Sequence, residues 1–73
     1  MVYYPNPVSN VLNIAMDQEI SEITVVNLIG QQVMSVPAHS SHATVDMTVL
    51  SEGAYLIKVV SGDQSKVVKV LKK

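Results

Sequence analysis

The residue types that could do chemistry in this chain gather in one polar stretch. His39 and His42 lie three residues apart, and Asp46 follows four residues after the second histidine. A metal site needs further ligands at close range, and strand geometry can point Asp46, the nearest carboxylate, away from the histidines. Ser40, His42 and Asp46 have the side chains of a hydrolytic triad, but no glycine elbow or oxyanion element accompanies them. We therefore expect a solvated loop here, with no catalytic residue and no metal ligand.

Three acidic residues form a second candidate site. Asp17, Glu19 and Glu22 lie close together in the sequence and could hold a calcium ion through their oxygen atoms. Their spacing differs from that of an EF-hand loop, and surface carboxylates are usually only solvated, so calcium binding stays open. A chain of 73 residues also offers little volume for a substrate pocket. We predict no enzymatic activity and no cofactor.

Composition indicates a single small domain over residues 1–73 that depends on its apolar core. The chain is 48% hydrophobic and 15% charged, and it has no cysteine for a disulfide or a thiolate metal site. Five lysines, no arginine and a net charge of −1 give no basic footprint, so we expect no nucleic-acid partner. No apolar run approaches the ~20 residues that span a bilayer, and the N-terminus lacks the pattern of a signal peptide. We therefore expect no membrane insertion.

Short β-branched runs separated by turn residues predict an all-β fold. Alternation places Ile57 and Val59 on one face of a strand and Lys58 on the other. Gly30 is expected in a turn that needs a positive φ, and the polar residues 17–19 and 37–42 are expected to interrupt strands. The pattern predicts a compact, immunoglobulin-like antiparallel β-sandwich of about seven short strands. Their expected ranges are 2–4, 11–16, 20–28, 32–36, 43–47, 54–60 and 66–71.

Tyr55 follows a glycine-containing corner at the start of the strongest strand. Leu50 precedes it by five residues, with Gly53 between them. This resembles a tyrosine corner, in which the phenol donates a hydrogen bond to upstream backbone. Alternatively, Tyr55 is an ordinary core aromatic residue. In both cases we expect a structural role.

Four stretches carry a more specific pattern: residues 4–8 (YPNPV), residues 23–33 (ITVVNLIGQQV), residues 50–59 (LSEGAYLIKV), and Gly62 followed by residues 66–69 (KVVK). In this order and spacing they resemble the type A C-terminal sorting domain of the type IX (Por) secretion system of Bacteroidetes. The resemblance covers residues 3–73, although residues 32–49 match no motif.

The resemblance implies a secretion signal at the C-terminus of a larger secreted parent protein. Such a domain passes through the periplasm and directs its parent through the outer-membrane translocon, with a shuttle protein among its partners. A sortase-like peptidase then removes it, at or before its start, and the parent reaches the cell surface or the medium. The resemblance places the sorting or recognition residues at Pro5, Asn6, Pro7, Gly30, Gly53, Tyr55, Lys58, Lys72 and Lys73.

Two further expectations concern binding surfaces. The final strand of a sandwich is often an edge, so a receptor could pair with it, and the weak first strand could exchange to form a homodimer. An alternative function is a fibronectin III-like adhesion or carbohydrate-binding module. Sugar-binding modules present exposed aromatic rings, and this chain offers only Tyr3 and Tyr4 besides Tyr55.

Overall fold

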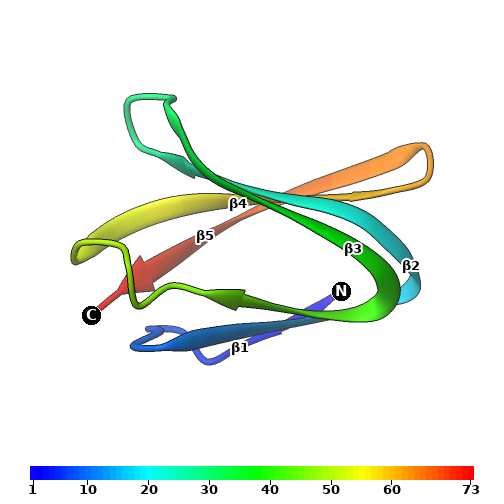
Figure 1. Cartoon of the computed structure of the whole chain (residues 1–73), viewed down its shortest axis with the longest axis horizontal. Coiled ribbons are helices and arrows are strands. Elements are labelled where there is room, and N and C mark those ends of the chain that lie inside the picture. The colour runs from blue at the N-terminus through cyan, green and yellow to red at the C-terminus, as the bar shows by residue number, and fades with distance from the viewer.

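A computed structural model describes residues 1–73 and contains five β-strands and no helix (Figure 1). All pairings between strands are antiparallel, which confirms the predicted fold class. No segment forms a helix with the length and hydrophobicity needed to cross a bilayer. The strands are β1 (Val2–Tyr4), β2 (Val11–Asn27), β3 (Gln32–Asp46), β4 (Gly53–Ser61) and β5 (Gln64–Lys72).

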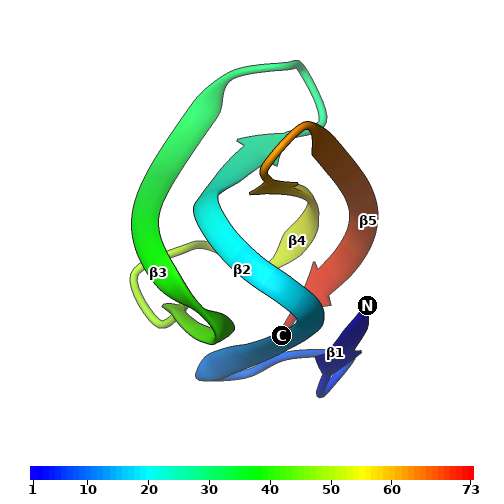
Figure 2. The same cartoon turned by 90° about the vertical axis from the view of Figure 1, so that its right-hand side faces the viewer.

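Two long, bent strands build the two layers of the fold. The first half of β2 pairs with β1 and with the second half of β3, as at Ile14, which lies opposite Tyr3 and Ala43. The second half of β2 pairs with the first half of β3 and with β4, and β5 completes that layer. Figure 2 shows β2 and β3 side by side along their curved length. The sandwich is therefore one sheet folded over on itself.

The predicted interruptions at residues 17–19 and 37–42 are wrong, because both segments lie inside strands. The pairing of β2 with β3 shifts register between Ala15 and Ile20 and again between Ile20 and Glu22. Such bulges let a strand bend while its backbone stays paired. The bends face solvent, which explains their polar composition. Two pairs of predicted strands are thus continuous, and seven become five.

The core lies between the two layers and follows the predicted alternation of side chains. Ile57 and Val59 are fully buried while Lys58, between them, is exposed. Each buried Ile or Val contributes roughly 1.5–3 kcal/mol relative to an exposed position, so these few side chains hold most of the fold. The buried apolar residues are Val8, Leu12, Ile14, Ile20, Ile23, Val25, Val45, Met47, Tyr55, Ile57, Val59 and Val70.

Candidate functional site

The residues around the Pro5-Asn6-Pro7 motif bind the last strand of the chain. The Val8 N–H donates to the Leu71 carbonyl at 2.8 Å, and the Lys73 N–H donates to the Val8 carbonyl at 2.8 Å. The Leu71 N–H donates to Asn6 Oδ1 at 3.1 Å, so an amide side chain takes the place of a strand carbonyl. We call this contact of residues 6–8 with residues 71–73 the terminal bridge. It joins the segment after β1 to the end of β5 and so closes the sheet.

The terminal bridge corrects the expectation of an open final strand. β5 is an edge strand whose full-length partner is β4, as predicted. Its last residues are nevertheless covered, because Val8 forms a parallel bridge with Lys72. Val8 is itself fully buried. Only the part of the β5 edge before Leu71 is therefore open.

Gly53 and Tyr55 form the predicted corner before β4. The Tyr55 hydroxyl donates to the Ser51 carbonyl at 2.8 Å, which is the hydrogen bond of a tyrosine corner. The ring is 8% exposed, so Tyr55 is also a core residue, and both alternatives describe it correctly. Gly53 has a φ of +148° with no atom within 4 Å of an added Cβ, so backbone conformation and not space requires glycine.

Gly30 lies in the turn between β2 and β3 with a φ of +90°, as predicted. Asn27 holds this turn, because its Oδ1 accepts hydrogen bonds from the Ile29 N–H at 3.1 Å and the Gln31 N–H at 2.9 Å. The turn therefore presents Leu28 and Ile29, which are 63% and 81% exposed. The role of Asn27 was missed from the sequence, although an asparagine that opens a turn is a recognised signal.

The predicted lysines belong to a larger basic surface. All five lysines lie within residues 53–73, which hold one acid, Asp63, for a formal charge of +4 (+5 − 1). Residues 1–52 contain five acids and no lysine, for −5, and the sum gives the net −1 of the chain. Lys58, Lys66, Lys69 and Lys73 are exposed, and Lys72 is half-buried. The β4–β5 hairpin and the chain end thus carry all the basic side chains.

No hydrogen bond joins the three side chains of the candidate triad, and the Ser40 hydroxyl accepts instead from the His42 backbone N–H at 3.2 Å. His42 lies opposite Ala15 on the first layer, and its Nδ1 lies 3.1 Å from the Ser41 hydroxyl. Asp46 faces Thr48 instead, whose hydroxyl and N–H (3.0 Å) both donate to Oδ1. These two bonds, the hydroxyl first, lower the pKa of Asp46 from its ordinary value of 3.8. No three His, Asp or Glu side chains gather as a metal site would require.

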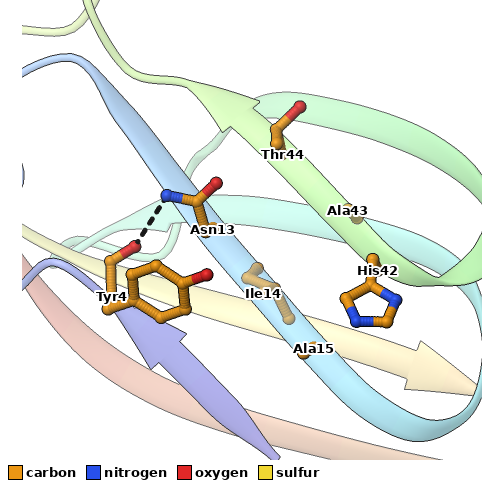
Figure 3. A pocket seen from close by; sticks show the side chains of 7 residues that line it. All are labelled: Tyr4, Asn13, Ile14, Ala15, His42, Ala43 and Thr44. Atoms are coloured by element: carbon orange, nitrogen blue, oxygen red, sulfur yellow. Dashed lines mark hydrogen bonds between the residues drawn. The ribbon is translucent and has the colours of Figure 1, made fainter.

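A shallow hollow lies on the outer face of the first layer, and Tyr4 is the one residue of the four motif stretches that lines it. It has a volume of about 230 Å³ and is lined by Tyr4, Asn13, Ala15, His42 and Thr44 with their neighbours. Figure 3 shows the rings of Tyr4 and His42 on either side of Ala15. Asn13 Nδ2 donates to the Tyr4 carbonyl at 3.3 Å and so ties β1 to β2. The hollow holds no cluster of ionisable groups that could do chemistry.

Comparison with known proteins identifies the pattern as a whole. A family model described as "Secretion system C-terminal sorting domain" matches residues 2–73. The match includes both partners of the terminal bridge, the corner at Gly53 and the basic hairpin. No curated protein matches the chain.

Proposed function

Because the chain belongs to the family of secretion system C-terminal sorting domains, which are type IX sorting signals, we propose that the machinery recognises it as a folded surface. The domain serves secretion across the outer membrane and interacts with the type IX machinery. The family match does not support an adhesion or carbohydrate-binding module. In our proposal the residues that the machinery reads therefore lie on the surface of the domain.

The terminal bridge carries the proposal of a folded signal. It brings the first motif of the family pattern against the last strand, which is 65 residues away in the chain for the pair Asn6 and Leu71. A linear tag would need no such contact. In our proposal Pro5, Asn6, Pro7, Gly30, Gly53 and Tyr55 position the surface, and Lys58, Lys72 and Lys73 are the parts that a receptor touches.

The arrangement of the termini suits a signal at the end of a larger protein. The C-terminus lies at one end of the long axis, and the N-terminus lies toward the other (Figure 1). A parent protein joined at the N-terminus would leave the C-terminal end accessible to the translocon and the shuttle protein. We propose transit through the periplasm, cleavage near the start by a sortase-like peptidase, and no catalysis by the domain itself.

Charge reversal at the chain end tests the proposed contact. Deleting Lys72 and Lys73 would also remove the N–H that Lys73 donates to Val8, so side-chain changes are the cleaner experiment. We expect Lys72→Glu with Lys73→Glu, in a secreted fusion, to lower export while the thermal midpoint stays close to that of the unchanged domain. Export equal to that of the unchanged fusion would remove the charged end from the recognition surface.

A homodimer by strand exchange remains a prediction. β1 spans only three residues and pairs with β2 alone, so its exchange between two chains would break the least strand pairing. Sedimentation of the isolated domain at several concentrations would measure the fraction that forms dimers.

A further inference from the structure

We propose, resting on the sorting function above, that the open edge of β5 at residues 65–69 binds an extended, acidic strand of a partner protein of the secretion machinery. The partner would extend the second layer by one strand. Two independent features of the molecule support this inference: unpaired backbone on the edge and the segregation of charge.

The first feature is a short row of backbone groups without backbone partners. The terminal bridge shows that the N–H and C=O of Leu71 both point away from β4. The β4–β5 register has no shift from Gly53↔Lys72 to Ser61↔Gln64, so every second residue of β5 points the same way. The N–H and C=O groups of Ser65, Val67 and Lys69 therefore face outward. None of them takes part in a backbone hydrogen bond outside the strand ladders.

The terminal bridge limits where a partner strand can bind. Val8 already occupies the end of the edge, at Leu71 and Lys73. The open part of the edge, at residues 65–69, spans four residue steps, or ~13 Å at about 3.3 Å per residue. An added strand of about five residues would pair with this row and stop at the bridge. The site therefore has a defined length and a blocked end, which an ordinary edge strand lacks.

The second feature is the charge around this row. Lys66 lies opposite Val59 on the inner face, and Lys69 lies opposite Leu56 on the outer face. Both are exposed, and Lys58 lies beside Val67 on the outer face. A strand added here would meet lysines on both of its faces, so it needs acidic side chains on both. No lysine side chain donates to an Asp or Glu side chain, since the one hydrogen bond they make runs from Lys72 Nζ to the Lys73 main-chain oxygen.

The same lysines disfavour a second copy as the occupant. Two β5 edges placed together would bring Lys66 and Lys69 of one chain against those of the other, and like charges across strands are destabilising. Val67 is 57% exposed on the outer face, so a partner with an apolar residue next to its acids would also cover apolar surface. The fitting partner therefore carries acidic residues on both faces and an apolar residue against Val67 on the outer face.

Amide hydrogen exchange on the whole chain tests the site with a defined probe. The probe is a synthetic peptide that repeats Glu-Glu-Val-Val, which places acids on both faces of a strand, and a Lys-Lys-Val-Val peptide of equal length is its control. We expect the acidic peptide to slow exchange at Ser65, Val67 and Lys69 about tenfold or more, because strand addition gives these amides an acceptor. The Lys66→Glu, Lys69→Glu double variant should weaken this binding about tenfold or more.

Three results would overturn the proposal. The first is unchanged exchange at all three amides with the acidic peptide, and the second is equal protection by both peptides. The third is protection by anionic phosphatidylglycerol vesicles without protection by the acidic peptide, which would indicate a lipid surface. Protection confined to residues outside 65–69 counts as the first result.

An export assay separates failure of this inference from failure of the sorting function. Val67→Pro removes an outward N–H without touching a β4 hydrogen bond, and proline is tolerated at strand edges. We expect a fluorescent fusion with this change, or with the double charge reversal, to lose export while its thermal midpoint is retained. If both variants are exported like the unchanged fusion, the edge is not used. If the unchanged fusion itself is not exported, the result contradicts the sorting function instead.

Discussion

Single polar side chains hold two loop regions of the fold in place. Asn6 accepts a hydrogen bond from Leu71, and Tyr55 donates one to Ser51 at the corner before β4. Both residues belong to the family pattern, yet their polar atoms are used inside the domain. The motif at this scale therefore describes how the fold is stabilised, and in our proposal the machinery recognises the side chains that the motif leaves exposed.

Replacing Asn6 by alanine tests the terminal bridge. The change removes the acceptor for the Leu71 N–H, and the loss of such a hydrogen bond costs about 0.5–1.5 kcal/mol. For a domain of this size each kcal/mol lowers the thermal midpoint by about 4–8 °C. Asn10→Ala is the matched control, since the bond at Asn10 is accepted by its backbone carbonyl from Met47. Equal midpoints for the two variants would mean that the Asn6 side chain does not hold β5.

Asp46 gives a prediction about pH. Its pKa is lowered mainly by the Thr48 hydroxyl and then by the Thr48 N–H. A lowered pKa stabilises the fold above the ordinary value of 3.8, and this contribution is lost as the pH falls through the lowered value. We expect Thr48→Val to raise the Asp46 pKa part of the way back, because the N–H remains. Carboxyl titration by NMR measures it, and an Asp46 pKa at or above 3.8 in the unchanged domain would contradict the assignment.

At the scale of elements, two long strands take the place of four. β2 and β3 each run through both layers, and the bend of β2 is held from outside the strand. The buried Ser61 hydroxyl, at the end of β4, donates to the Glu19 carbonyl at 2.6 Å. That bond satisfies a backbone carbonyl in the region where the β2–β3 register shifts.

Ser61→Ala should therefore loosen the bend. The variant leaves the Glu19 carbonyl without its donor, and an unsatisfied group in a protected position costs about 1–3 kcal/mol. Chemical denaturation measures the free energy of unfolding of this variant. The control is Ser65→Ala, which changes an exposed serine of the same hairpin. If Ser61→Ala is no less stable than Ser65→Ala, water replaces the hydroxyl and the bend is held by the strands alone.

Local patterns in the sequence predicted the faces of the strands but not their continuity. Alternation placed Ile57 and Val59 on one face, which is the buried one, and glycine placed the turn at Gly30. The polar run at residues 37–42 has the composition of a loop, because a bend in a strand exposes its residues as a loop does. The pairing of Asn6 with Leu71 had no local signal at all, since it depends on how the whole sheet closes.

For the candidate site, the motifs predicted a set of positions but not what each one does. The predicted set mixes residues that hold the fold, such as Asn6 and Tyr55, with exposed lysines such as Lys58. In the sequence, Lys66 and Lys69 look only like the charged residues that protect an edge strand against aggregation. Only the direction of the β5 backbone shows that they flank unpaired groups. That direction depends on pairing with β4 and on the terminal bridge, which sequence periodicity does not contain.

At the scale of the whole molecule, the basic side chains are confined to the β4–β5 hairpin and the chain end. Residues 53–73 carry +4 and residues 1–52 carry −5, so the near-neutral total conceals two opposite halves. Such a surface steers an acidic partner toward the β4–β5 hairpin, and the effect weakens as salt screens it. This distribution suits a domain that is recognised through one side.

Export of a foreign protein tests the sorting function most directly. Residues 1–73 are placed at the C-terminus of a fluorescent protein with a periplasmic signal, in a bacterium that has the type IX system. We predict fluorescence in the medium or on the cell surface, and its loss in a translocon mutant. A fusion that stays in the periplasm, intact and folded, in the bacterium with a working translocon would contradict the sorting function.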